Sequence, residues 1–193
     1  MSKKNAYVFL YNKFADFEIS QALLLLIKDY NIITVGFDEG LVRSYSNLLV
    51  KAEMAIGDLD TENVDVLIIP GGEPKEIIWD ESLTEKVRVL NEKLIQLNKS
   101  EKIISAICGG PTFLANAGVL DERKCTASIG DDEREFYKKS IFKEDDFIID
   151  GHILTAQGHA FSDFAVQLAK MCDAIKTDEE MNRTLDWLRK KKN

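Results

Sequence analysis

A ten-residue segment at positions 103–112, IISAICGGPT, constrains the fold of this chain more than any other segment. Its first five residues are typical of a short buried strand, and Pro111 suits the first position of a helix. Cys108 stands between them, where Gly109 and Gly110 let the strand and helix backbones approach closely. The segment therefore predicts a nucleophile elbow, in which a sharp turn holds the nucleophile above a sheet.

Cys108 itself has two interpretations. A cysteine at an elbow faces the amino terminus of the next helix, whose partial positive charge favours thiolate over thiol, so we expect a reactive nucleophile. The alternative is a small buried apolar residue at the end of a core strand, because free cysteines are among the most buried residue types. The Gly-Gly-Pro sequence that follows has no use in a plain core strand, so it favours the elbow.

The rest of the chain alternates strand-like and helix-like segments, which indicates a parallel sheet covered by helices on both faces. We expect strands at residues 6–11, 32–37, 64–69, 103–107 and 124–128, and hairpins at 40–57 and 147–157. Helices are expected at about 18–28, 82–97 and 161–171, and from 177 to a basic end at 189–192, with a helical or loop segment at 131–139. We expect one domain over residues 1–193.

Two of the expected helices carry start signals. Ser82 with Glu85, and Thr177 with Glu180, have the spacing of a capping box. The basic end at 189–192 is either a binding patch or, as we favour, a set of cations that complement the helix dipole.

Charge and cysteine usage exclude several classes of protein. The 193 residues include 25 basic and 33 acidic side chains, a net charge of −8, so we expect no nucleic-acid partner. We expect neither a signal segment nor a membrane span, because no apolar stretch has the length or flanks of either. Three cysteines without C-x-x-C spacing fit a cytoplasmic protein without a metal site. No dinucleotide or phosphate-loop motif occurs, and we expect no cofactor.

Chemically useful residues follow four of the expected strands. They are Glu18, the pair Gly71-Gly72, Cys108 and His159. Ligands bind beyond the carboxyl ends of strands in open parallel sheets, so we expect these residues to share one site. The amides of Gly72 and Gly109 would donate to an oxyanion, and a protonated Glu18 would donate to the sulfur, since two adjacent anions repel each other.

Each of these residues also has a simpler interpretation. Glu18 suits the first turn of a helix through the dipole, and a Gly-Gly pair is common in turns. His159 fits a general base and a helix amino terminus about equally well. Cys125 and Cys172 lie in apolar patterns and are expected to be structural.

Four motifs together resemble the ThiJ/PfpI superfamily. They are the strand at 6–11 followed by Glu18, IIPGG at 68–72, AICGGP at 106–111, and LTAQG at 154–158 after an Asp-Gly turn. The resemblance covers about residues 4–170 and extends to class I glutamine amidotransferases. It implies a flavodoxin-like sheet, an elbow cysteine paired with a protonated glutamate, frequent dimers, and activities that include deglycase, glyoxalase, amidase or protease, isocyanide hydratase, chaperone and redox sensor.

Departures from the patterns of individual branches narrow this range. Gly109 stands where PfpI-type proteases have a histidine, and Ser128 replaces the histidine of the parkinsonism-associated deglycase branch. Isocyanide hydratases have an aspartate in place of Glu18. His159 lies broadly where amidotransferases place their catalytic histidine.

Together these observations predict an α/β, flavodoxin-like three-layer sandwich with a mainly parallel sheet. The expected function is that of a cysteine enzyme, a hydrolase or lyase, acting on a small electrophilic carbonyl or amide through Cys108, Glu18 and His159. The alternative is a non-enzymatic redox sensor or stress-protective protein whose Cys108 is oxidised to sulfinic acid. The expected partners are a small-molecule substrate and a second copy of the chain.

Overall fold

Seven strands form the central sheet of the computed structural model, which describes residues 3–189. Their spatial order is β10 (Phe147–Asp150), β11 (Ile153–Ala156), β7 (Ile103–Ile107), β6 (Val66–Ile69), β1 (Lys4–Leu10), β2 (Tyr30–Gly36) and β5 (Met54–Ala55). Only β10 and β11 pair antiparallel, as the predicted hairpin. The five longer parallel strands follow the flavodoxin order 2-1-3-4-5, which confirms the predicted fold class.

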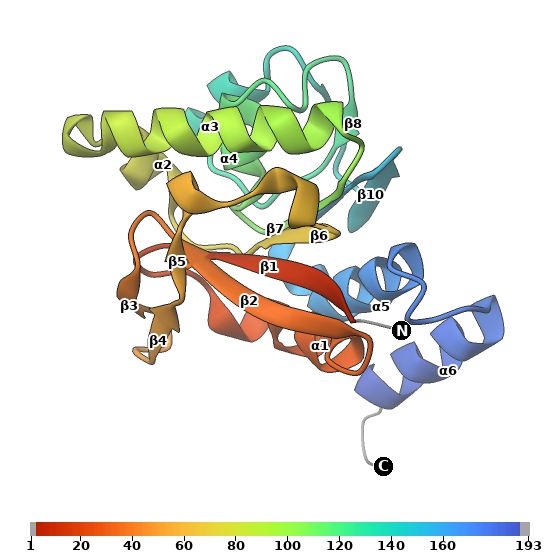
Figure 1. Ribbon diagram of the computed structural model, residues 1–193. Helices are drawn as coiled ribbons and strands as arrows, with labels where there is room; N and C mark the ends of the chain where they lie inside the picture. The colour runs from red at the N-terminus through yellow and green to blue at the C-terminus, as the bar shows by residue number, and fades with distance from the viewer. Residues whose placement is uncertain (1–2, 190–193) are drawn as a thin grey trace.

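Helices cover both faces of this sheet (Figure 1). One face carries α1 (Asp16–Leu26) and α5 (Phe161–Met171), and the other carries α2 (Pro74–Ile78), α3 (Thr84–Lys99) and α4 (Pro111–Asn116). The last helix, α6 (Asp178–Arg189), packs on the outside of α5. Strands β6 and β7 are buried between the two layers, which explains their nearly continuous apolar sequences.

Shorter elements complete the chain. The hairpin predicted at 40–57 consists of β3 (Gly40–Arg43) and β4 (Leu49–Ala52), and β8 (Lys124–Cys125) pairs with β9 (Ile141–Phe142). Five 3-10 turns are η1 (Ile56–Asp58), η2 (Thr61–Asn63), η3 (Glu81–Leu83), η4 (Asp131–Tyr137) and η5 (Gly158–Ala160). The strand predicted at 124–128 is thus only two residues long, because the backbone then turns toward the site and pairs with Cys108.

One predicted capping box is wrong, and the other is nearly right. The Ser82 N–H donates to Oδ1 of Asp80 at 2.9 Å rather than to the Glu85 carboxylate, and the 3-10 turn η3 delays the start of α3 to Thr84. Before α6, Oγ1 of Thr177 accepts the N–H of Glu180 at 3.1 Å as predicted. The Glu180 carboxylate reaches the N–H of Lys176 instead of that of Thr177.

The basic end at 189–192 lies mostly outside the described residues. Its first member, Arg189, forms an ion pair with Asp163 of α5. Within residues 3–189, no helix has the length and apolar character that crossing a bilayer requires.

Candidate functional site

The turn after β7 holds Cys108 in a left-handed backbone conformation, with φ of +59°. This conformation is unfavourable for a residue with a side chain, and it is typical of strained functional turns. Backbone hydrogen bonds fix it on both sides: the Cys108 N–H donates to the Ala156 carbonyl at 2.8 Å, and the Ser128 N–H donates to the Cys108 carbonyl at 2.9 Å. Strand, turn and helix α4 therefore have the backbone geometry predicted for the elbow, and the role of Cys108 as a nucleophile stays a prediction.

Glu18 lies in the first turn of α1, and only 4% of its surface is exposed. The backbone N–H of Gly71 donates to its Oε2 at 3.0 Å. A Cβ at position 71 would overlap Oε2 and lie 2.5 Å from Cβ of Cys108. Gly71 is therefore the residue that allows β6, Glu18 and Cys108 to meet, a role that the Gly-Gly pair alone did not reveal.

Gly158 lies against the side chains of both Cys108 and Glu18. A Cβ at this position would lie 2.9 Å from Sγ of Cys108 and 3.1 Å from Oε1 of Glu18. The Gly158 N–H donates to Oγ of Ser128 at 2.9 Å. The structure thus places Ser128 beside the site. It also shows that Gly158, which the sequence presents only as the last residue of the LTAQG motif, is a site residue.

Glu18 and Cys108 affect each other's ionisation. Burial raises the pKa of Glu18, while hydrogen bonds from Cys108 and from the Gly71 amide oppose this rise. Burial, the charge of an ionised Glu18 and the hydrogen bond to it raise the pKa of the Cys108 thiol to about 12. The sequence predicts a lowered pKa for the Cys108 thiol, but the pKa is raised when Glu18 is ionised. A lowered thiol pKa stays a prediction for the protein with a protonated Glu18. Two anions at this range repel each other, so the pair retains one proton.

Interaction with the backbone amides of Gly109 and Gly72 favours the thiolate and lowers the pKa of the Cys108 thiol, against the larger effects above. These are the two amides predicted to bind an oxyanion. The sulfur lies in a pocket of about 270 Å³, here named the Cys108 pocket. Its lining residues are Ala15, Phe17, Glu18, Tyr45, Gly72, Glu73 and Cys108. The sequence did not identify Phe17, Tyr45 and Glu73 as site residues. Tyr45 reaches the pocket from the β3–β4 hairpin loop, which carries no recognisable motif.

His159 does not line the Cys108 pocket. Its side chain is 65% exposed, and Nε2 lies 2.9 Å from Oδ1 of Asp146. A role for His159 as general base stays a prediction.

The other two cysteines are buried and outside the pocket, with exposed fractions of 0% for Cys125 and 3% for Cys172. Burial raises the pKa of both thiols. Within the part of the chain that the structure describes, no three His, Cys, Asp or Glu side chains gather as they would around a metal ion.

The sequence and the structure of this chain are both similar to those of known proteins. The uncharacterised protease YoaZ of Bacillus subtilis is 23% identical, over 92% of this chain and 88% of its own length. The deglycase PfpI of Pyrococcus furiosus is 29% identical, over 62% of this chain and 69% of its own. The crystal structure of a ThiJ/PfpI family protein from Bacillus anthracis is 25% identical, with a TM-score of 0.83, over 100% of this chain and 93% of that one. The model of the DJ-1/PfpI family matches residues 4–171, so this chain belongs to the DJ-1/PfpI family.

Proposed function

We propose that this protein is an enzyme that adds the sulfur of Cys108 to a small electrophilic carbonyl compound, such as a 2-oxoaldehyde or its adduct. One observation carries the proposal: the buried Glu18 carboxyl lies beside the Cys108 sulfur, and the backbone N–H groups of Gly72 and Gly109 interact with the same sulfur. Relatives named as deglycases support it.

The proposed first step conserves atoms and electrons. The Cys108 thiol gives its proton to Oε1 of Glu18, and a sulfur lone pair forms a bond to the carbonyl carbon. The π electrons of the carbonyl move to its oxygen, where the amides of Gly72 and Gly109 stabilise the negative charge. Glu18 then returns the proton to this oxygen, which gives a hemithioacetal.

With a 2-oxoaldehyde, Glu18 also carries the next proton. It takes the proton from the former aldehyde carbon of the hemithioacetal and delivers it to the neighbouring ketone carbon, while the hydroxyl proton of the hemithioacetal moves to the ketone oxygen, which gives a 2-hydroxy thioester. Water then cleaves the thioester to a 2-hydroxy acid and the free thiol. The aldehyde is oxidised and the ketone is reduced within one molecule, so no external oxidant or reductant takes part.

The pocket favours small, uncharged reactants. Its volume of about 270 Å³ lies just below the usual range for ligand sites, and its lining includes the carboxyl groups of Glu18 and Glu73. These groups repel anions, so we infer a neutral carbonyl or amide beside the sulfur.

The second candidate function is a redox sensor with the same sulfur. Hydrogen peroxide would convert the thiolate to sulfenic acid and hydroxide, and a second peroxide would convert the sulfenic acid to sulfinic acid and water. The amides of Gly72 and Gly109 favour this candidate as well, because they would donate to the sulfinate oxygens.

A substrate panel tests the proposal. Methylglyoxal, glyoxal, a thiol hemithioacetal and an amide are each incubated with wild type, Cys108→Ala and Cys172→Ala, and products are followed by NMR. We expect wild type and Cys172→Ala to turn over a carbonyl compound and Cys108→Ala to be inactive, since Cys172 is equally a thiol but buried. No turnover by wild type, with selective oxidation of Cys108 by peroxide, overturns the enzyme and supports the sensor.

We further propose a homodimer. Phe17, Leu24 and Ile27, along α1 and at its end, are 51%, 56% and 58% exposed, and their spacing places them on one helical face. An exposed apolar stripe of this kind is typical of a protein interface.

A further inference from the structure

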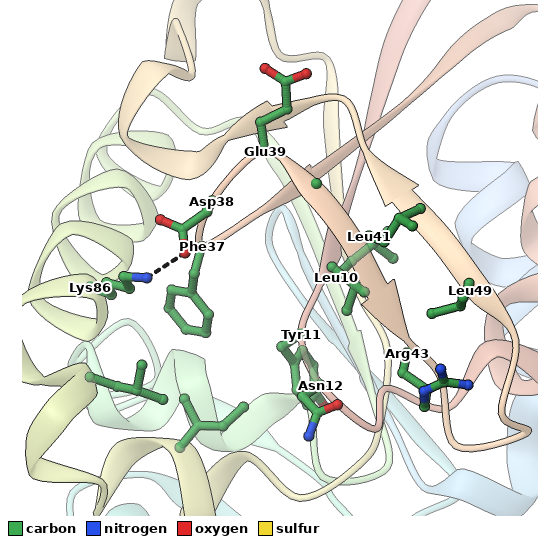
Figure 2. A pocket seen from close by; sticks show the side chains of 14 residues that line it. Leu10, Tyr11, Asn12, Phe37, Asp38, Glu39, Leu41, Arg43, Leu49 and Lys86 are labelled. Atoms are coloured by element: carbon green, nitrogen blue, oxygen red, sulfur yellow. Dashed lines mark hydrogen bonds and ion pairs between the residues drawn. The ribbon is translucent and has the colours of Figure 1, made fainter.

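A second, larger hollow lies between the β3–β4 hairpin and helices α2 and α3 (Figure 2). It has a volume of about 540 Å³, and we name it the apolar hollow. Half of its fourteen lining residues have aliphatic or phenyl side chains: Leu10, Phe37, Leu41, Val42, Leu49, Ile77 and Leu83. Arg43 stands at one end, and the ion pair of Asp38 with Lys86 stands at the other. Its size is that of a site for a small organic molecule.

A third hollow, of about 550 Å³, lies next to this one and next to the Cys108 pocket. It shares Asn12 and Arg43 with the apolar hollow, and it shares Tyr45 and Glu73 with the Cys108 pocket. Because each neighbouring pair of hollows has two lining residues in common, the three follow one another along the surface. We name the whole the extended groove.

The extended groove crosses the position at which this fold usually binds ligands. Asn12 follows β1 and Glu73 follows β6, two neighbouring parallel strands. The chain leaves β1 for α1 on one face of the sheet and leaves β6 for α2 on the other (Figure 1). The crevice at such a reversal, beyond the carboxyl ends of the strands, is the general ligand position of open α/β sheets.

Arg43 supplies a polar anchor midway along the groove. Its Nη1 donates to the carbonyl oxygen and to Oδ1 of Asn47, the latter at 2.8 Å. Among residues 3–189, Nε and Nη2 make no hydrogen bond with the protein. These two donors suit a carboxylate, a sulfonate or another acceptor of a ligand in the groove.

We propose, building on the proposed function, that the substrate is an amphipathic carbonyl compound that fills the extended groove. Its carbonyl carbon lies at Cys108, a hydrogen-bond acceptor or anion lies at Arg43, and an alkyl or aryl group lies in the apolar hollow. The Cys108 pocket selects the reacting group, and the apolar hollow selects the substituent.

Alkylation of Cys108 tests this groove without any catalytic turnover. The probes are iodoacetamide itself and N-substituted iodoacetamides that carry a naphthalene group on linkers of increasing length, with and without a sulfonate. Labelling rates at Cys108 are measured by mass spectrometry at pH 9 for wild type, Leu49→Gln and Leu48→Gln. Leu49 lines the apolar hollow and Leu48 does not, although they are adjacent and similarly exposed, at 54% and 56%.

We expect naphthyl reagents of one intermediate linker length to label wild type with saturation. The half-saturating concentration should rise about fivefold in Leu49→Gln and stay unchanged in Leu48→Gln, because only Leu49 contacts the bound ring. The sulfonate should tighten binding in wild type and have no such effect in Arg43→Gln. Rates that are independent of the tail, or equal losses in both leucine variants, overturn the proposal.

A binding measurement covers the case in which Cys108 alkylates slowly. The matching naphthyl acetamides lack the iodine and cannot react, so their fluorescence gives a dissociation constant directly. This dissociation constant should show the same linker optimum and the same contrast between Leu49→Gln and Leu48→Gln. A dissociation constant that depends on neither the linker nor Leu49 overturns the proposal. Tail-dependent binding without turnover of any carbonyl compound would instead refute only the proposed enzyme.

Discussion

Oε2 of Glu18 accepts a hydrogen bond of 3.0 Å from the backbone N–H of Gly71, so this oxygen is fixed on the β6 side of the site. The other oxygen, Oε1, faces the position where Gly158 leaves room beside the Cys108 sulfur. A proton on Glu18 therefore belongs on Oε1, because Oε2 already acts as an acceptor. The Gly71 amide thus orients the carboxyl group for proton exchange with the sulfur.

Replacement of Glu18 by glutamine should lower the pKa of the Cys108 thiol. The charge of the Glu18 carboxylate contributes to the raised thiol pKa, and the variant removes this charge. We expect the midpoint of the alkylation-rate profile to fall by at least about one pH unit. Iodoacetamide labelling between pH 5 and pH 11 measures it, and an unchanged or higher midpoint would show that Glu18 is not ionised when the thiol titrates.

Replacement of Gly158 by alanine should separate Glu18 from Cys108. The added methyl carbon would lie 2.9 Å from the sulfur, closer than normal contact, so the two side chains must move apart. We expect turnover to fall about tenfold or more, with a loss of stability of about 1–3 kcal/mol. Gly57→Ala is the matched control, since its methyl group would meet Val89 at an ordinary 3.7 Å. Equal activity of the two variants would contradict this geometry.

The backbone strain at Cys108 predicts an unusual order of stability. With φ at +59°, glycine should suit position 108 better than alanine, by up to about 1 kcal/mol after its greater chain entropy is included. At Ser105, within β7, the order should reverse, with alanine favoured by roughly 0.5–1 kcal/mol. Urea unfolding of the four variants measures both differences, and the same order at both positions would argue against strain in the elbow.

His159→Ala tests the predicted general base. The side chain is exposed and bonded to Asp146, so we expect turnover to change less than about twofold. Asp146→Ala serves as the companion variant, because it removes the hydrogen-bond partner and leaves the imidazole. A loss of about 10²-fold in His159→Ala alone would establish His159 as the base.

The proposed dimer should depend on the exposed face of α1. Ile27→Glu places a charge in the apolar stripe, whereas Ile141→Glu makes the same change at an exposed isoleucine of β9, away from α1. Sedimentation equilibrium should give a dimer for wild type and Ile141→Glu and a monomer for Ile27→Glu. A monomeric wild type at micromolar concentration would refute the dimer.

The sequence was sufficient for the sheet and for the elbow because both depend on local patterns. The apolar run at 103–107 and the Gly-Gly-Pro that follows it specify a strand and a turn within ten residues. The start of α3 was misplaced because Asp80 and Ser82 are both good caps, and the sequence does not show which side chain the 3-10 turn will use.

The less predictable parts of the site come from long-range contacts. Positions 71 and 158 require glycine because a Cβ there would collide with Glu18 and Cys108, which are far apart in sequence. Tyr45 comes from a hairpin loop whose position the strand pattern does not determine. The ionisation of Cys108 was also beyond local reasoning. A helix amino terminus lowers a thiol pKa, but the burial of the sulfur and the charge of Glu18 act more strongly in the other direction.

Ser128 joins the two backbone segments on either side of the sulfur, through the carbonyl of Cys108 and the N–H of Gly158. Gly158 lies against this sulfur, so a group added to the sulfur changes the surroundings of the Gly158 backbone. The Gly158 N–H, which donates to Ser128, should therefore respond to a change at the sulfur without taking part in the reaction. The NMR chemical shift and the deuterium exchange rate of this N–H should distinguish free, acylated and oxidised Cys108. The state of the cysteine could then be followed without a probe attached to the sulfur.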